Sequence, residues 1–271
     1  MSSFKHIPKK MNIPKELLDN DFLFHYSKSY VAMEKILYEK KIRFSSLINM
    51  NDPYEYKLPS LGVMGKGGVA EATASELTGK LRNTILYKAK ILSLVRNKEV
   101  NSETDFQLVF AKPRLWAQYA EAQRGVCLVF SLTTFLEKIR AAYSDITIYN
   151  NFVEYDLQKG RRSSKNHLKY DKSKSPDENI QCHIHTNQKD IFFRKHEDFG
   201  DENEYRIVLI NWTDKSNNDI FIDLRGILRA VILGERFHRT YETLIKTLTE
   251  QLNVNLYKIA YASNVYIQKI I

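Results

Sequence analysis

Two residues of this sequence have the type and the setting that acid–base or electrostatic catalysis requires. His25 stands in the aromatic, apolar segment FLFHYS, where a histidine is more often a hydrogen-bonded core residue than a functional one. Glu204 opens the apolar segment EYRIVLINW directly after a run of acidic residues. A carboxylate at the end of a buried strand is well placed to be desolvated and coupled to other charges, as catalytic acids often are. The alternative is that Glu204 simply pairs with Arg206 or Arg194 at a sheet edge.

Aromatic residues form a second group of candidates. The segment 112–124 predicts a helix with Trp116 and Tyr119 on one face, and Gly125 is expected to end it. Such rings usually pack in a core, but an aromatic ring can also stack on a planar ligand. The segment NDPYE, at 51–55, is a turn signal followed by acidic residues, and such a segment is usually structural.

The common signatures of nucleotide-binding and hydrolytic enzymes are absent from the sequence. No GxxxxGK[ST] or GxGxxG segment occurs, which argues against a P-loop ATPase and a Rossmann dehydrogenase. No GxSxG segment occurs, and neither Cys127 nor Cys182 stands in a recognisable nucleophile context. His183 and His185 could begin a zinc site on an extended segment, but no third ligand is nearby, so we expect no metal.

The elements that must position these residues are strands and helices in uneven order. Apolar or alternating segments predict strands at 22–27, 42–47, 125–131, 146–155, 204–212, 219–224, 229–234, 255–262 and 265–270. Helical spacing predicts helices near 30–40, 69–92, 112–124, 135–139 and 239–252. Many strands with irregularly placed helices predict an α+β fold rather than an alternating α/β fold.

Length and composition indicate a folded protein of one domain with insertions. The 271 residues divide to fewer than two domains of about 150 residues, and 43% of them are hydrophobic. We expect a single α+β domain over residues 1–271, with a helical insertion at about 60–105 and a basic loop at about 156–195. The two cysteines cannot form a disulfide framework, and no apolar run is long enough to span a bilayer. We therefore expect a cytoplasmic protein without a membrane partner.

The net charge of +9 is concentrated in two segments. Residues 1–15 carry four lysines and no acid, and residues 158–174 carry seven basic residues against one acid. The rest of the chain is close to neutral. A basic loop of this kind can bind a polyanion such as a nucleic-acid backbone, although it can also be only a solvated, mobile loop.

The order of several short motifs resembles a large bacterial family of uncharacterised proteins, often found near phage-defence genes. That family shows HYT, NDPFE, WxxYA followed by GV, and EYR. The corresponding segments here are His25–Ser27, Asn51–Glu55, Trp116–Ala120 with Gly125-Val126, and Glu204–Arg206. The resemblance covers about residues 22–234.

A weaker resemblance is to ADP-ribosyltransferase domains, including toxins that modify DNA or RNA. A strand-borne His before a Ser and a helix looks like their first strand, and Asn203-Glu204-Tyr205 looks like the strand that carries their catalytic glutamate. Carried over, the catalytic residues are His25, Tyr119 and Glu204, with Tyr26 and Tyr54 as competitors for the tyrosine. The implied fold has two small mixed or antiparallel sheets that form an NAD-binding cleft, flanked by helices.

The resemblance implies NAD as the substrate and a nucleic acid as the acceptor. Breaking the nicotinamide–ribose bond passes through an oxocarbenium-like state, as in glycoside hydrolysis, which a carboxylate can stabilise. Arg43 is the residue expected to bind the pyrophosphate, because guanidinium groups bind phosphates in a planar, multidentate way. The residues expected to bind NAD are His25, Tyr26, Ser27, Arg43, Tyr54 and Trp116. The residues expected to bind the RNA or DNA acceptor are Lys159, Arg161, Arg162 and Lys165.

The sequence therefore predicts an NAD-dependent ADP-ribosyltransferase, acting as a toxin or anti-phage defence effector on RNA or DNA, with a neutralising antitoxin as a possible protein partner. One alternative is a metal-dependent nuclease, in which Asp52, Glu55 and Glu204 gather Mg²⁺. A second is a non-enzymatic module that binds a nucleic acid or a phage component.

Overall fold

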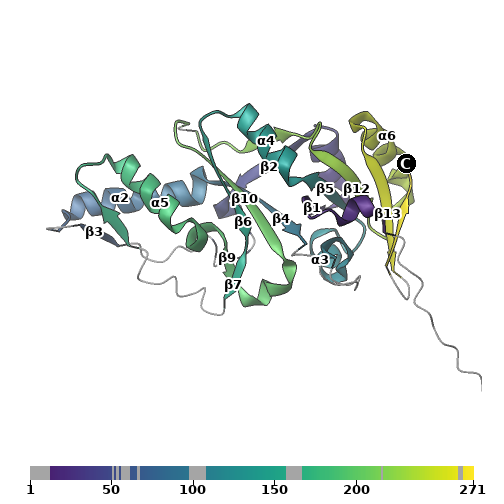
Figure 1. The fold of residues 1–271 in the computed structure, drawn as a ribbon, viewed down its shortest axis with the longest axis horizontal. Coiled ribbons are helices and arrows are strands. Elements are labelled where there is room, and N and C mark those ends of the chain that lie inside the picture. The colour runs from purple at the N-terminus through teal and green to yellow at the C-terminus, as the bar shows by residue number, and fades with distance from the viewer. Residues whose placement is uncertain are drawn as a thin grey trace, which may run out of the picture. The chain divides into compact units, whose positions relative to one another are not determined.

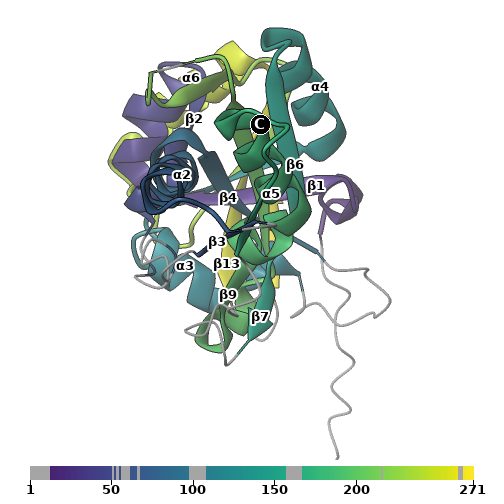
Figure 2. The same cartoon turned by 90° about the vertical axis from the view of Figure 1, so that its left-hand side faces the viewer.

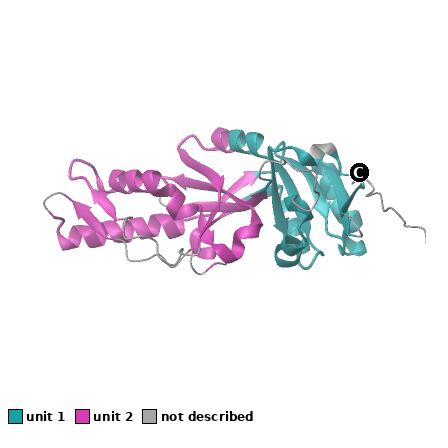
Figure 3. Cartoon of the chain, turned by 60° about the horizontal axis from the view of Figure 1, so that its bottom comes forward, with its two compact units in different colours: residues 1–42, 96–138, 223–271 teal, residues 43–95, 139–222 magenta. Residues whose placement is uncertain are grey.

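The computed structural model describes most of the chain in two compact units. The described residues are 13–50, 52, 55, 62–65, 68–97, 108–156, 167–214, 216–261 and 265–271. Unit 1 comprises residues 1–42, 96–138 and 223–271, and unit 2 comprises residues 43–95 and 139–222 (Figure 3). Each unit is thus assembled from segments that are distant in the sequence.

Unit 1 contains five neighbouring strands of a sheet (Figure 1). Their order is β1 (Phe22–Ser27), β5 (Val126–Ser131), β12 (Leu228–Leu233), β13 (Asn255–Tyr261) and β14 (Val265–Lys269). All neighbouring pairs are antiparallel except β12 and β13. That parallel pair is joined by the crossover helix α6 (Glu242–Leu252), as parallel pairing requires. Strand β5 is buried along its whole length, which explains its continuous apolar sequence.

Short helices complete unit 1. Besides α6, its helical elements are η1 (Lys15–Leu18), η2 (Val31–Leu37), η6 (Val109–Ala111), α3 (Pro113–Tyr119), most of α4 (Leu132–Ala142), and η8 (Arg239–Tyr241). Helix α3 begins with a proline at its first position, where the missing N–H is not needed.

Unit 2 is built around β10 (Glu204–Asn211), a strand with antiparallel neighbours on both sides. The neighbours are β4 (Lys90–Arg96) and β6 (Ile146–Phe152). The end of β2 (Lys41–Ser46) pairs with β4, and β11 (Ile220–Asp223) is the next strand beyond β2. Because β10 is internal, seven of its eight residues are buried.

Two short parallel pairs and several helices complete unit 2. The pairs are β3 (Val63–Gly65) with β8 (Leu168–Tyr170), and β7 (Glu154–Asp156) with β9 (Arg194–His196). The helical elements are η3 (Leu47–Asn49), α2 (Glu71–Asn83), η4 (Thr84–Lys88), α5 (Pro176–Phe192) and η7 (Glu197–Glu202). Helices α2 and α5 lie side by side (Figures 1 and 2), and their apolar faces share one core.

The predicted α+β class is confirmed as a mixed structure with a mostly antiparallel sheet and several helices. Most predicted strands agree with observed strands to within a few residues. Three predictions of local structure are wrong, and each error has a physical reason.

The first error is the helix over 112–124, since α3 ends at Tyr119. Glu121, Ala122 and Gln123 all adopt the left-handed backbone conformation, with φ of 53°, 51° and 69°. Three consecutive L-residues in this conformation cost free energy that local propensity does not predict, so only tertiary contacts can impose it.

The second error concerns residues 69–92, of which the helical part ends at Lys88. Lys90, Ile91 and Leu92 instead begin β4, where they pair with β10. The apolar residues of this stretch fit both a helical and a strand spacing, and the position of β10 decides between them.

The third error is the assignment of the 156–195 region to a loop and of His183 and His185 to an extended segment. Both histidines lie in α5. Ser175 and Glu178 form a reciprocal capping box at its start, and Pro176 occupies the first turn. The sequence SPDE was therefore a readable helix signal within this region.

Candidate functional site

Glu204 occupies the first position of β10, immediately after a left-handed turn. Asn203 has φ of 52° and separates η7 from the strand. Side chains alternate along a strand, so Glu204 and Arg206 share one face while Tyr205 is on the other. The Tyr205 hydroxyl donates to Oδ1 of Asn150 on β6 at 2.6 Å. The motif EYR thus places one carboxylate and one guanidinium side by side on one face of a buried strand.

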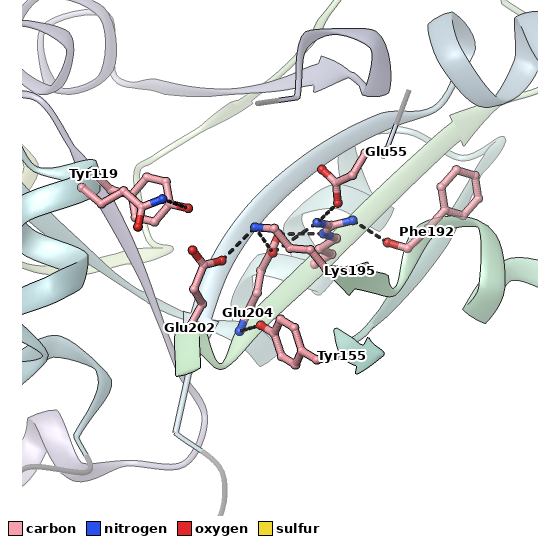
Figure 4. Close-up of polar contacts among 9 residues, drawn as sticks. Glu55, Tyr119, Tyr155, Phe192, Lys195, Glu202 and Glu204 are labelled. Atoms are coloured by element: carbon pink, nitrogen blue, oxygen red, sulfur yellow. Dashed lines mark hydrogen bonds and ion pairs between the residues drawn. The ribbon is translucent and has the colours of Figure 1, made fainter. Parts of the chain in front are cut away.

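The Arg206 guanidinium binds the carboxylates of Glu55 and Glu204 and the main-chain carbonyl of Phe192, and these three partners are labelled in Figure 4. Its Nε donates to Oε1 of Glu204 at 2.6 Å, and its Nη2 donates to Oε2 of the same carboxylate at 3.1 Å. Nη2 also forms an ion pair with Oε1 of Glu55. Nη1 donates to the carbonyl of Phe192 at 2.8 Å, at the end of α5. Arg206 is only 1% exposed.

A second cation reaches Glu204 from β9. The ammonium of Lys195 lies 2.8 Å from Oε2 of Glu202 and 3.2 Å from Oε2 of Glu204. It also lies 4.1 Å from the centroid of the Phe199 ring, a cation–π distance. We refer to the five charged residues Glu55, Lys195, Glu202, Glu204 and Arg206 as the Glu204 cluster. All five side chains are almost completely buried.

These contacts keep Glu204 in its ionised form. Burial raises the pKa of Glu204, but the charges of Arg206 and Lys195 and the hydrogen bonds with Arg206 and Ser93 outweigh burial, and this pKa falls from 4.5 to about 2. Burial likewise lowers the pKa of Lys195, but the carboxylates of Glu204 and Glu202 outweigh that effect and raise it. The main-chain N–H of Glu204 donates to the hydroxyl of Tyr155 at 3.0 Å, which fixes the start of the strand.

The predicted histidine and its neighbours lie on β1 of unit 1. His25 is half-buried and opposes Leu128 of β5. Tyr26 is buried, and its hydroxyl donates to the carbonyl of Val109 at 2.6 Å. Ser27 is also buried, and its hydroxyl donates to the carbonyl of Lys28.

The predicted aromatic residues lie on α3, also in unit 1. Trp116 is fully buried; its Nε1 donates to the carbonyl of Phe110 at 2.8 Å, and its ring meets the Tyr26 ring edge-on at 5.1 Å. Tyr119 is half-buried, and its hydroxyl accepts from Nε2 of Gln118 at 3.0 Å. Burial of Trp116 and Tyr26 agrees with the core packing that their spacing also allowed, and their assignment to NAD stays a prediction.

The other residues predicted to bind NAD or the acceptor lie either at the surface of unit 2 or outside the described residues. Arg43 lies on β2 with 60% of its side chain exposed, and it pairs with Asp219 at 3.5 Å. Tyr54 and the four basic residues expected to bind the acceptor lie outside the described residues: Lys159, Arg161, Arg162 and Lys165. Unit 2 therefore holds Arg43 and Glu204, whereas unit 1 holds His25, Tyr26, Ser27, Trp116 and Tyr119.

Sequence reasoning missed that Glu55 and Arg206 belong to one cluster with Lys195. The spacing Glu-x-Arg at the start of a strand was the readable signal for the Glu204–Arg206 pair, since it puts both side chains on one face. Glu55 is 151 residues from Arg206 in the sequence, and only the tertiary structure joins them. Nothing in the sequence around Lys195 indicated its role.

Among the described residues, no three His, Cys, Asp or Glu side chains are grouped so as to hold a metal ion. Glu55 and Glu204, two of the three carboxylates expected for a nuclease, both bind Arg206 instead. Within the same described residues, none of the helices combines the length and the apolar character that crossing a bilayer requires.

Comparison with protein-family models gives a match over part of the chain. Residues 115–207 match the model of a family described as a protein of unknown function, DUF2971. The matched stretch begins just before Trp116 and ends just after Arg206. No curated protein and no solved structure matches the chain. The comparison thus supports similarity to an uncharacterised family over about a third of the chain.

Proposed function

We propose that this protein is an NAD-dependent ADP-ribosyltransferase in which Glu204 is the catalytic carboxylate. The observation that carries the proposal is the position of Glu204, whose carboxylate is held by Arg206 and Lys195 at the first residue of β10. These two cations lower its pKa and keep it ionised. Such a carboxylate remains negative at any physiological pH. Its orientation is fixed before a substrate arrives, as electrostatic catalysis requires.

The proposed reaction breaks the bond between the nicotinamide nitrogen and C1′ of the ribose. The bonding electron pair leaves with nicotinamide, which becomes neutral, and positive charge develops on the ribose as in glycoside cleavage. The carboxylate of Glu204 stabilises this charge, and an acceptor nucleophile then bonds to C1′ and releases its proton to solvent water. We assign His25 to a ribose hydroxyl, Tyr119 to stacking on nicotinamide, and Arg43 to the pyrophosphate.

The proposed acceptor is RNA or DNA, and the proposed setting is a cytoplasmic toxin or defence effector that an antitoxin protein neutralises. The charge of residues 158–174 supports this choice, with seven basic residues against one acid. Phosphate backbones bind such segments through counterion release, whatever the base sequence.

Labelled NAD tests the proposal. The protein is incubated with NAD labelled in the adenylate part and with separate pools of RNA, DNA and protein, and free nicotinamide is measured alongside. We expect nicotinamide release and label transfer to a nucleic-acid pool. Glu204→Gln is expected to abolish both while the protein stays folded. The matched control is Glu76→Gln, which changes an exposed helical ion pair and should leave turnover unchanged. Folded wild-type protein that releases no nicotinamide would contradict the proposal.

One observation favours a second candidate, a non-enzymatic binding module. Glu204 is 4% exposed and is bound by two cations of its own chain, which is what a purely structural carboxylate would show. For this candidate, Glu204→Gln alters only stability, and neutralising residues 158–174 removes nucleic-acid binding. The same labelled-NAD experiment, with binding measured in parallel, distinguishes the two.

A further inference from the structure

Arg206 joins two segments that lie far apart in the sequence. Glu55 comes from the NDPYE segment and Glu204 from the EYR segment, and both carboxylates contact Nη2 of Arg206. The guanidinium is planar and its donors have fixed directions. With Nε on Glu204, Nη1 on Phe192 and Nη2 shared between the two carboxylates, all three nitrogens of Arg206 are held.

The negative charge of Glu55 is not needed to balance the rest of the Glu204 cluster. Without Glu55, the cluster pairs two carboxylates, Glu202 and Glu204, with two cations, Lys195 and Arg206. Glu55 adds a third carboxylate that is 3% exposed. Burying a charge costs free energy unless its contacts compensate for it, and a neutral glutamine could occupy the same place. A carboxylate at position 55 therefore adds a negative charge beside Arg206 that a glutamine would not supply.

The charge of Glu55 can control both the orientation of the Arg206 guanidinium and how much of the Glu204 charge that guanidinium neutralises. By sharing the guanidinium, Glu55 takes up part of the positive charge that would otherwise neutralise Glu204. It also fixes the rotation of the guanidinium plane, so that Nε and Nη2 meet the two oxygens of Glu204 side-on. Both effects leave Glu204 correctly oriented and more able to stabilise a positive charge in its surroundings.

We propose that Glu55 is a positioning residue for Glu204, acting through Arg206. This inference rests on the proposed function in so far as Glu204 is the catalytic carboxylate. The inference gives the NDPYE segment a role in the proposed transferase. Until this point, Tyr54 was the one residue of that segment with an assigned role. The contact itself is independent of any activity, so it can be tested in two ways.

The kinetic test uses Glu55→Gln, which keeps the shape of the side chain and removes its charge. We expect kcat for nicotinamide release to fall by about tenfold to a hundredfold, as for a small misplacement of a catalytic group, with KM changed less than about threefold. Glu55→Asp, which keeps the charge, is expected to recover part of the lost kcat and also serves if Glu55→Gln does not fold. The control Glu76→Gln should behave as wild type. Wild-type kcat in folded Glu55→Gln would overturn the inference.

The spectroscopic test follows the Nε–H group of Arg206 by NMR, identified by its loss in Arg206→Lys. In the wild type this proton is hydrogen-bonded to Glu204 and buried, so we expect slow exchange with solvent. In Glu55→Gln we expect a shifted resonance and faster exchange, whereas Glu76→Gln should change neither. An unchanged signal in Glu55→Gln overturns the inference. If wild-type protein releases no nicotinamide, the proposed function fails, and this signal alone then decides whether Glu55 positions the Arg206–Glu204 pair.

Discussion

At the scale of single residues, the strongest feature is that Glu204 depends on partners from several segments. Arg206 is its neighbour on the strand, Lys195 comes from β9, and Glu55 acts on Arg206 from far away in the sequence. Burial would make this carboxylate hard to ionise, but the two cations reverse that effect. The charge state of Glu204 is therefore a property of the Glu204 cluster, and it has measurable consequences for stability.

We predict that Glu204 makes stability depend on pH in the acidic range. Its pKa is about 2 in the folded protein against 4.5 ordinarily, so the folded state favours the ionised form. This contribution, on the order of 3 kcal/mol, is fully present above about pH 4.5 and is lost as the pH falls toward about 2. Denaturant unfolding between pH 5 and 3 should show a smaller loss of stability in Glu204→Gln than in wild type. An equal loss in both proteins would contradict this prediction.

We predict that Arg206→Met destabilises the protein strongly. The change removes the guanidinium and leaves the Glu55 and Glu204 carboxylates buried near each other, and breaking a buried pair in this way costs about 3–5 kcal/mol. The matched control is Arg225→Met, because Arg225 is 70% exposed and pairs with Asp223 at the surface. That pair should contribute less than about 1 kcal/mol. Denaturant unfolding at pH 7 measures both changes, and similar losses would argue against a special role for Arg206.

At the scale of elements, the connection from α3 to β5 in unit 1 is set by tertiary contacts. The carboxylate of Glu121 accepts hydrogen bonds from the hydroxyl of Ser29 at 2.8 Å and from its main-chain N–H at 3.3 Å. The carbonyl of Gln123 accepts from the N–H of Arg236 at 3.0 Å. These bonds hold the left-handed turn against its local cost. As a consequence, this left-handed turn places Gly125 in close contact with the main chain of β1.

We predict that Gly125→Ala is destabilising because the added Cβ would lie 2.2 Å from the carbonyl oxygen of Ser27. Main-chain atoms on both sides would have to move, at a cost of about 1–3 kcal/mol or more. The matched control is Gly79→Ala on α2, where an added Cβ meets nothing within 4 Å. That change should stabilise the helix by about 0.5–1 kcal/mol. Thermal unfolding measures the midpoint temperature of both variants. Equal changes in this temperature for Gly125→Ala and Gly79→Ala would show that the close approach at Gly125 does not affect stability.

At the scale of the whole molecule, the basic charge of the sequence is localised rather than spread. The segments 1–15 and 158–174 hold the surplus, while the rest of the chain is nearly neutral. The Glu204 cluster is also nearly balanced, with three acidic and two basic side chains. Electrostatic attraction of a polyanion should therefore follow those segments and not the Glu204 cluster.

We predict that replacing Lys159, Arg161, Arg162 and Lys165 with glutamine weakens binding to single-stranded RNA or DNA. For each phosphate that is no longer neutralised, the slope of log affinity against log salt should fall by about 0.7, so the fourfold variant would lower it by almost 3. Fluorescence anisotropy between about 50 and 200 mM salt measures this slope. Replacing Lys5, Lys9 and Lys10 is the matched control and should leave most of the slope intact. If the N-terminal variant lowered the slope and the fourfold variant did not, the nucleic acid would bind at the N-terminal segment instead.

The sequence by itself determined the α+β class, most strands, and the pairing of residues that are close along one strand. Apolar runs such as VCLVFS are strong local signals, and the Glu-x-Arg spacing fixes the shared face of Glu204 and Arg206. Residue pairs of this kind follow from the period of the strand alone. The sequence also identified His25 and Tyr119 as candidate catalytic residues, but it could not determine their positions in the fold.

Only the tertiary structure decided which charges meet. Glu55, Lys195 and Arg206 are brought together from three segments, and the left-handed turn at Glu121–Gln123 exists because distant hydrogen bonds outweigh its local cost. Local propensity has no information about a partner 151 residues away. Buried ion pairs and strained turns persist only where the surrounding fold compensates for them, so they are the features that a sequence read locally must miss.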